Sequence, residues 1–297
     1  MECVLTLIAS AQAPLEDALV AAARDALHQR HATVSPPVWL APREACDVAF
    51  ADLEPDMADA AVRARIGDAP VDIVCQPVAD RRKMLLVADM DSTIVTAETL
   101  DELAAFAGLK TEIATITARA MAGELDFESA LRERVAMLKG LNADALAKTF
   151  AEIEYTPGAH ALVQTMTANG AHCMLVSGGF TYFTERVAAH CGFHEAHANT
   201  LGMDGNCLDG TVGEPILGRD AKLRALLEAA GARRLPLTRT CAVGDGANDV
   251  AMLQAAGLGV AYHAKPMVQD MVRVKINHGD LTALLYAQGY RKEEFKG

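Results

Sequence analysis

The chain has 297 residues, of which 51% are hydrophobic and 22% charged, and its formal net charge is -12 at pH 7. This length allows one large or two moderate domains, and the composition is that of an ordinary globular protein, which argues against disorder. The negative charge argues against nucleic acid or an anionic membrane as a partner. No apolar run approaches the ~18 residues that a membrane-spanning helix needs.

The cysteines and the first residues indicate the cellular compartment. None of the seven cysteines forms a Cys-x-x-Cys pair, and several lie within apolar strand patterns, as is typical of reduced, buried thiols. Residues 1–13 end superficially like a signal cleavage site, but Glu2 is acidic, no Lys or Arg is present, and the apolar stretch is short. We therefore expect a cytoplasmic protein whose chain begins with a strand.

Residues 1–80 predict a small α+β domain. Their apolar patterns indicate a strand (3–9), a helix (14–29), strands near 33–40 and 46–52, a helix (56–66) and a strand (71–76). This βαββαβ order resembles the ACT-type amino-acid-binding domain in topology alone. An amino acid bound at this domain is therefore a candidate partner. A second copy of the chain, forming a homodimer, is a further candidate. The basic cluster at 81–83 is typical of a solvated linker.

A strand that ends in two carboxylates comes next. Residues 84–88 form a continuous apolar run, typical of a parallel strand buried on both faces. Asp89 then stands at the carboxyl end of the strand, where open α/β sheets bind ligands, and it could attack phosphorus if a cation offsets the repulsion. Asp91 could act as general acid and then as general base. Alternatively, Asp89-x-Asp91-Ser92-Thr93 only caps a helix.

Residues 97–155 show helical periodicity without a strong strand, which predicts a helical cap inserted into a catalytic domain of residues 81–297. The fold class is α/β, with a Rossmann-like parallel sheet that continues through strands at 172–176, 240–243 and 258–260. The glycine-rich stretch 199–215 predicts hairpins at the edge of this sheet.

Two candidate anion-binding elements lie in this domain. Ser177-Gly178-Gly179 follows a predicted strand and precedes a helix, so a hydroxyl and backbone amides could receive an anion there. Lys222 begins an amphipathic helix and could offer a point charge to a phosphate, although a lone lysine is more often a solvated surface residue.

A second acidic motif follows the strand at 240–243. Gly244 and Gly246 permit a tight loop, and Asp245 and Asp249 add two carboxylates of the kind that suits Mg²⁺. The alternative is an ordinary Gly-Asp-Gly turn before a helix. Three histidines between 190 and 197 have zinc-like spacing, but Gly192 interrupts them, and we expect a helix end that leads into a short strand.

Taken in order, Asp89-x-Asp91, Ser177-Gly178, Lys222 and Asp245 to Asp249 resemble the four motifs of the haloacid dehalogenase superfamily, and specifically of its phosphoserine phosphatases. The resemblance covers residues 84 to about 290. It implies Mg²⁺-dependent hydrolysis of O-phosphoserine, a small-molecule substrate, to serine and phosphate through an aspartyl-phosphate intermediate, the last step of serine biosynthesis. Related ion pumps carry Thr at the position of Asp91, so Asp91 favours a phosphatase.

The resemblance also implies roles for individual residues. It assigns the metal to Asp89, Asp91, Asp245 and Asp249, and the phosphate to Ser177, Gly178, Lys222 and Asn248. In the predicted cap, Glu98 matches the family's residue that binds the substrate ammonium, and Arg134 matches the arginine that binds the substrate carboxylate. Met121 and Phe127 match apolar residues that close over the site. Without the resemblance, Glu98 and Arg134 would be interpreted as solvated charges on helices, and Met121 and Phe127 would be interpreted as core residues.

Two rival functions stay open at this stage. Another small phosphomonoester could be the substrate, with the four motifs unchanged and differences only at Glu98 and Arg134. A non-enzymatic, amino-acid-sensing protein would place the function in residues 1–80, but the four motifs would then be vestigial.

Overall fold

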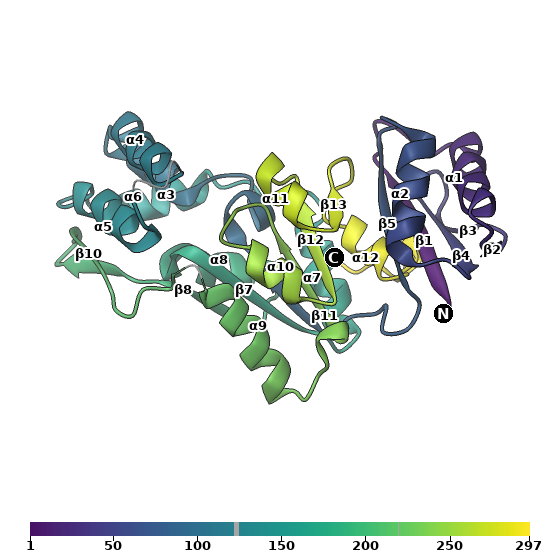
Figure 1. Ribbon diagram of the computed structural model, residues 1–297. Helices are drawn as coiled ribbons and strands as arrows, with labels where there is room; N and C mark the ends of the chain where they lie inside the picture. The colour runs from purple at the N-terminus through teal and green to yellow at the C-terminus, as the bar shows by residue number, and fades with distance from the viewer. Residues whose placement is uncertain (122–124, 219) are drawn as a thin grey trace.

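An antiparallel sheet forms the N-terminal end of the molecule (Figure 1). The computed structural model describes residues 1–121, 125–218 and 220–297, with the side chains of residues 118, 120 and 121 left out. The strand order is β2-β4-β1-β5, with β3 paired to β4, and two helices pack against the sheet. The elements are β1 (Cys3–Ala9), α1 (Asp17–Gln29), β2 (Thr33–Val34), β3 (Val38–Ala41), β4 (Ala45–Ala51), α2 (Pro55–Ile66) and β5 (Val71–Pro77).

The predicted βαββαβ order is present with one difference. The single strand expected near 33–40 is divided into β2 and β3, and Pro36 and Pro37 lie between them. Because proline has no backbone N–H to donate to a ladder, the pair interrupts the strand.

The second sheet has six parallel strands in the order β13-β12-β11-β6-β7-β8. The strands are β6 (Leu85–Ala88), β7 (His172–Phe180), β8 (Glu195–Asn199), β11 (Thr240–Gly244), β12 (Leu258–Tyr262) and β13 (Val274–Ile276). Helices cover both faces, namely α7 (Ala159–Ala168), α8 (Thr181–Cys191), α9 (Ala221–Ala232), α10 (Val250–Ala255), α11 (Pro266–Met271) and α12 (Ala283–Ala287). This arrangement confirms the predicted α/β class.

The alternation of side chains along β6 explains its continuous apolar run. Leu86 and Ala88 belong to the core that includes residues of α7 and α8, whereas Leu85 and Val87 belong to the core formed with α9 and α10. Both faces of the strand are therefore dry, and the first polar residue, Asp89, falls where the strand leaves the sheet.

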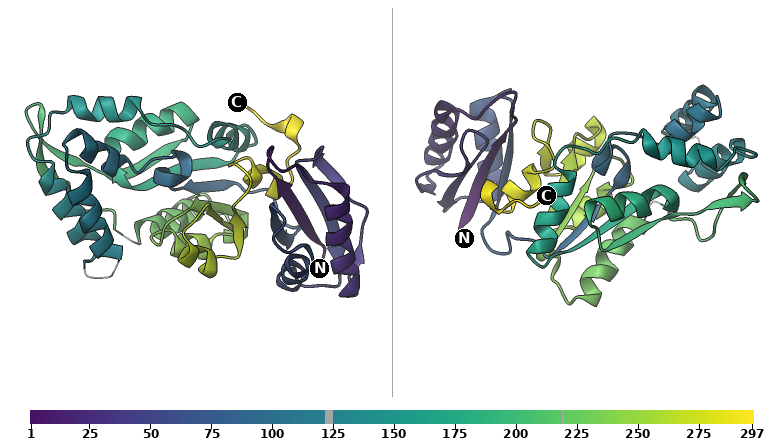
Figure 2. Two further views of the ribbon diagram at one scale, coloured as in Figure 1. Left: turned by 90° about the horizontal axis from the view of Figure 1, so that it is seen from above. Right: turned by 180° about the vertical axis from the view of Figure 1, so that it is seen from behind.

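Four helices form a cap at the other end of the molecule (Figure 2). They are α3 (Thr99–Phe106), α4 (Lys110–Met121), α5 (Phe127–Met137) and α6 (Asp144–Ala151). None of the helices within the described ranges combines the length and hydrophobicity that a membrane crossing requires.

A hairpin forms within residues 199–215, as predicted, but its predicted place at the edge of the parallel sheet is wrong. The strands β9 (Leu201–Asp204) and β10 (Cys207–Val212) form a separate two-stranded sheet that lies against α5 of the cap. The Gly140 N–H donates to the Leu208 carbonyl, and the Leu208 N–H donates to the Leu141 carbonyl, each at 2.8 Å. The hairpin pairs with the turn between α5 and α6 because Leu201, Leu208 and Val212 bury their side chains with the cap.

The expectation of a solvated basic linker is also wrong. Arg81 pairs with Asp47 through its two terminal guanidinium nitrogens, at 2.6 and 2.8 Å, and donates from Nε to the Ala287 carbonyl. The Lys83 ammonium is buried and donates to two carbonyl oxygens. The linker is therefore a packed joint between the N-terminal sheet and the parallel-sheet domain.

Candidate active site

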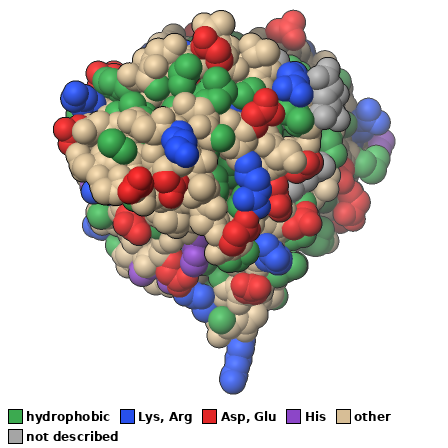
Figure 3. Space-filling model, turned by 90° about the vertical axis from the view of Figure 1, so that its left-hand side faces the viewer, with side chains coloured by type: hydrophobic (Ala, Val, Ile, Leu, Met, Phe, Trp, Pro, Cys, Tyr) green, Lys and Arg blue, Asp and Glu red, His purple; other side chains and the backbone are tan. Residues whose placement is uncertain are grey.

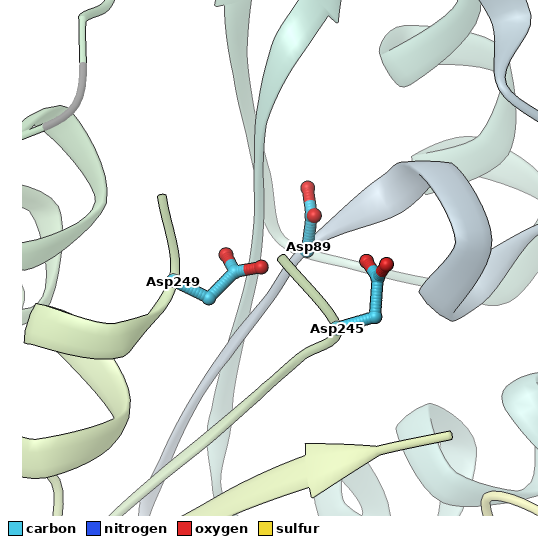
Figure 4. Close-up of side chains that lie close together, drawn as sticks. All are labelled: Asp89, Asp245 and Asp249. Carbon is cyan, nitrogen blue, oxygen red and sulfur yellow. The ribbon is translucent and has the colours of Figure 1, made fainter. Parts of the chain in front are cut away.

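The two acidic motifs meet at the carboxyl ends of neighbouring strands. Residues Leu85–Ala88 of β6 pair in parallel register with Thr240–Val243 of β11, so Asp89 and Asp245 leave the sheet side by side. Carboxylate oxygens of Asp89, Asp245 and Asp249 lie within 4.8 Å of one another, and all three side chains are buried (Figure 4). The structure thus brings together the carboxylates that the sequence predicts to meet.

The glycines of the second motif allow the carboxylate of Asp249 to lie close to the backbone at the end of β11. A Cβ atom on Gly244 would lie 2.3 Å from Cγ of Asp249, so any side chain there would displace the carboxylate. The Gly246 N–H donates to Oδ2 of Asp249 at 2.9 Å and fixes its orientation. The tight loop is therefore built around Asp249.

Lys222 supplies the positive charge of the cluster. Its Nζ lies 2.7 Å from Oδ1 of Asp89 and 2.6 Å from Oδ1 of Asp249, and the residue is 3% exposed. Burial alone would lower the pKa of Lys222, but Asp249 and Asp89 together raise it above its ordinary value. The alternative of a solvated surface lysine is wrong.

One lysine does not balance the buried carboxylates. Burial and then the charge of Asp249 raise the pKa of Asp89 well above its usual range. Burial and Asp249 likewise raise the pKa of Asp245 to about 6. Ionising these groups together is unfavourable without a further cation, and hard carboxylate oxygens are the ligands that Mg²⁺ prefers. The donor set therefore fits a magnesium ion.

Asp91 lies in the loop Met90–Ile94 that follows Asp89. Its Oδ1 accepts the Thr99 N–H at 2.9 Å, at the start of the cap, and its Oδ2 accepts the Ser177 hydroxyl at 3.2 Å. Burial and then the neighbouring charge of Glu98 raise the pKa of Asp91 to about 6. A Cβ on Gly179 would lie 3.0 Å from Oδ2 of Asp91, so this glycine leaves the carboxyl group its space.

A pocket beside the cluster unites the predicted phosphate-binding residues. It is lined by Phe127, Val176, Ser177, Gly178, Leu217, Gly218, Ala221, Lys222 and Asn248. Phe127, from α5, covers Gly178 so closely that a Cβ there would lie 3.1 Å from the ring. Leu217 and Gly218 also line the pocket, which the sequence did not predict. An apolar residue followed by glycine gives no local signal of a binding site. The pair is marked only by its place a few residues before Lys222.

The predicted cap residues take different positions. Glu98 is exposed, and its Oε1 accepts the Ser92 hydroxyl at 2.8 Å beside the acidic loop. Arg134 is half-buried in α5, where its Nε donates to the Ala130 carbonyl at 3.1 Å; burial lowers its pKa, while Asp101, Glu98 and Asp91 oppose that effect. Met121 is the last residue of α4, and its side chain lies outside the described residues.

The outer face of the cap mixes acidic, basic and apolar side chains (Figure 3). The histidines of α8 and β8 contact other side chains: His190 stacks on Tyr155 with ring centroids 4.1 Å apart, and His197 lies 3.3 Å from Glu195. As expected, α8 ends at Cys191 and leads into β8.

Among the described residues, Asp89, Asp245 and Asp249 are the one group of His, Cys, Asp or Glu side chains that could hold a metal ion.

The sequence and fold of this chain match those of known proteins. The family described as haloacid dehalogenase-like hydrolase matches residues 86–254. A phosphoserine phosphatase of Idiomarina loihiensis is 41% identical over 201 residues, which cover 68% of this chain and 91% of the relative.

A phosphoserine phosphatase of Streptomyces coelicolor is 41% identical over 83% of this chain, but this match spans 60% of the relative's length. A solved structure described as a phospho-aspartyl intermediate analogue of phosphoserine phosphatase is 37% identical, covers 69% of this chain and 98% of that one, and has a TM-score of 0.65.

Proposed function

Since this chain belongs to the phosphoserine phosphatases among the haloacid dehalogenase-like hydrolases, we propose that it hydrolyses O-phosphoserine to serine and phosphate, as the last step of serine biosynthesis. The observation that carries the proposal is the buried contact of Lys222 with Asp89 and Asp249 beside Ser177-Gly178. The contact joins three of the four motifs, and Lys222 also lines one pocket with the fourth, Ser177-Gly178.

In the proposed reaction, Asp89 attacks phosphorus and forms an aspartyl-phosphate. The relative solved with an analogue of such an intermediate supports this step. Asp91, held between Thr99 and Ser177, protonates the serine oxygen as it leaves, and then removes a proton from the water that hydrolyses the intermediate. A pKa of about 6 leaves Asp91 able to act in both directions near neutral pH.

A magnesium ion would be held by Asp89, Asp245 and the backbone carbonyl of Asp91. Asp249 would help to orient this ligand set and would not bind the ion directly, because its two oxygens already accept hydrogen bonds from Lys222 and the Gly246 N–H. When bound, it supplies positive charge that offsets the repulsion between the carboxylates and the phosphate.

Ser177, the Gly178 N–H, Lys222 and Asn248 hold the phosphoryl oxygens in the pocket that they line. Arg134 and Glu98 read the carboxylate and ammonium of the substrate, and Phe127, with Met121, excludes water when the cap closes. An amino acid bound at the N-terminal domain, and a homodimer, stay predictions.

A panel of phosphorylated small molecules, assayed with and without Mg²⁺, tests the proposal. We expect phosphoserine to give the highest kcat/KM, and turnover to disappear when Mg²⁺ is chelated. A higher kcat/KM for another small phosphomonoester would favour the rival specificity, and the absence of turnover for every ester would remove the enzymatic function.

A further inference from the structure

A buried amide joins two segments that line the phosphate pocket: Ser177-Gly178, in the irregular last part of β7, and Leu217-Gly218, in the loop before α9. Asn199, 2% exposed, donates from Nδ2 to the Gly178 carbonyl at 2.9 Å and accepts the Leu217 N–H on Oδ1 at 2.7 Å. Both polar ends of the side chain are thus used, one on each side of the pocket. No other described side chain hydrogen-bonds to both segments.

The position of Asn199 follows from an irregularity in the sheet. The pairing of β7 with β8 shifts register between Val176 and Phe180, and Asn199, the last residue of β8, pairs with Phe180. The chain from Ser177 to Gly179 therefore leaves the regular ladder and has backbone groups free for side chains. Because the amide of asparagine carries a donor and an acceptor, it can satisfy one group from each segment.

The second segment sets the position of Lys222. The Ala221 N–H donates to the Gly218 carbonyl at 3.0 Å, and Lys222 follows within the first turn of α9. A displacement of Leu217 and Gly218 would thus move the ammonium relative to the Ser177 hydroxyl. Catalysis tolerates little displacement of such groups, because a misplacement of about 1 Å can lower the rate about 100-fold.

We propose that Asn199 is a positioning residue for the phosphoryl group: it fixes the spacing between Ser177-Gly178 and the Leu217-Gly218 loop, which precedes the first turn of α9 with Lys222. This inference rests on the proposed phosphatase function and adds a residue to it that the four motifs do not include. Asn199 does not line the pocket itself and acts through the two segments.

The test compares Asn199→Leu with a matched control, Gln288→Leu. Gln288, 1% exposed, also joins two backbone groups, the Lys83 N–H and the Leu284 carbonyl, but at the amino end of β6, away from the pocket. Asn199→Leu leaves the Gly178 carbonyl and the Leu217 N–H without their side-chain partner. Gln288→Leu does the same to the Lys83 N–H, while the Leu284 carbonyl keeps the backbone N–H of residue 288, so both variants should lower the melting temperature. We expect only Asn199→Leu to lower kcat/KM for phosphoserine, by about 10- to 100-fold, and to raise the inhibition constant of orthophosphate.

A second variant, Asn199→Asp, keeps the acceptor for Leu217 and loses the donor to Gly178. Because a buried carboxylate oxygen would then face the Gly178 carbonyl oxygen and repel it, we expect a loss of kcat/KM and a weaker response to orthophosphate than in the wild type. Folded Asn199 variants whose kcat/KM and orthophosphate inhibition match those of Gln288→Leu would overturn the proposal, as would misfolding of both Asn199 variants while Gln288→Leu folds. Failure of the wild type to hydrolyse phosphoserine would instead reject the proposed function.

Discussion

The ammonium of Lys222 lies 2.7 Å from a carboxylate oxygen of Asp89, and both side chains are almost fully buried. The contact holds the proposed nucleophile beside the charge that would receive the phosphate. It also makes the site electrostatically interdependent, because the same ammonium lies 2.6 Å from Asp249. The consequences can be measured through both activity and stability.

Lys222→Met should abolish most of the activity and destabilise the fold. The substitution keeps an unbranched side chain but leaves Asp89 and Asp249 without their cation, and breaking a buried ion pair costs about 3–5 kcal/mol. Urea unfolding without Mg²⁺ should show this loss, and added Mg²⁺ should recover part of it. Lys148→Met, at an exposed position of α6, is the control and should match the wild type. An unchanged midpoint for Lys222→Met would mean that the ion pair contributes no stability.

Asp89→Asn should eliminate turnover while the protein stays folded. The amide keeps the shape of the side chain and its acceptor for the Met90 N–H, but it is no longer a nucleophile. Removing one of the mutually repelling carboxylates should leave the melting temperature equal to or above that of the wild type. Residual phosphoserine hydrolysis in a preparation free of wild-type enzyme would contradict the covalent mechanism.

Asp91→Asn should slow the reaction by about 10²- to 10⁴-fold, because the carboxyl group serves first as acid and then as base. The side chain can still accept the Thr99 N–H, so the cap should stay in place. Stopped-flow and steady-state measurements would show both half-reactions slowed. Wild-type rates in this variant would remove the role assigned to Asp91.

Mg²⁺ should stabilise the protein more at pH 7.5 than at pH 5. The pKa values of Asp91 and Asp245 are raised to about 6 in the folded protein, so the folded state binds more protons than the unfolded state between pH 4 and 6. These two groups therefore destabilise the metal-free protein increasingly as the pH rises through this window, and the penalty is complete above it. Metal binding requires deprotonated carboxylates and relieves that penalty.

At a Mg²⁺ concentration about 100 times the dissociation constant, the gain should be about 2.7 kcal/mol. Thermal unfolding with and without Mg²⁺ at both pH values measures it. Asp245→Asn should remove most of the shift, whereas Asp144→Asn, on the exposed surface of α6, should keep it. An equal shift in both variants would place the metal elsewhere.

Arg134→Ala should impair the hydrolysis of phosphoserine selectively. If the guanidinium pairs with the substrate carboxylate under the closed cap, its loss should cost about 2–5 kcal/mol in kcat/KM. p-Nitrophenyl phosphate has no amino-acid moiety, so its slower hydrolysis should change little. Equal losses for the two esters would show that Arg134 serves the phosphate or the fold.

Sequence patterns located Asp89 and Asp245 because each ends an apolar strand, and adjacent parallel strands bring their carboxyl ends together. The same reasoning reached Ser177, which lies in the last part of β7, where the pairing with β8 shifts register. It could not reach contacts that depend on tertiary packing. Nothing local shows that Lys222 is buried between two carboxylates, or that Asn199 joins two segments.

The two wrong predictions have related causes. A basic cluster at a domain junction resembles a solvated linker until its partner is known, and the partner of Arg81 is Asp47, 34 positions earlier in the chain. The hairpin β9–β10 has ordinary turn chemistry, but its place against the cap depends on the apolar surface of the cap against which Leu208 packs. Both outcomes depend on residues distant in sequence.

The most direct measurement is a rapid-quench experiment with ³²P-labelled phosphoserine and Mg²⁺. The account predicts an acid-stable, hydroxylamine-sensitive label that forms and decays during turnover, maps to the peptide containing Asp89, and is absent in Asp89→Asn. Turnover of phosphoserine with no label on that peptide, or with the same label in Asp89→Asn, would contradict it.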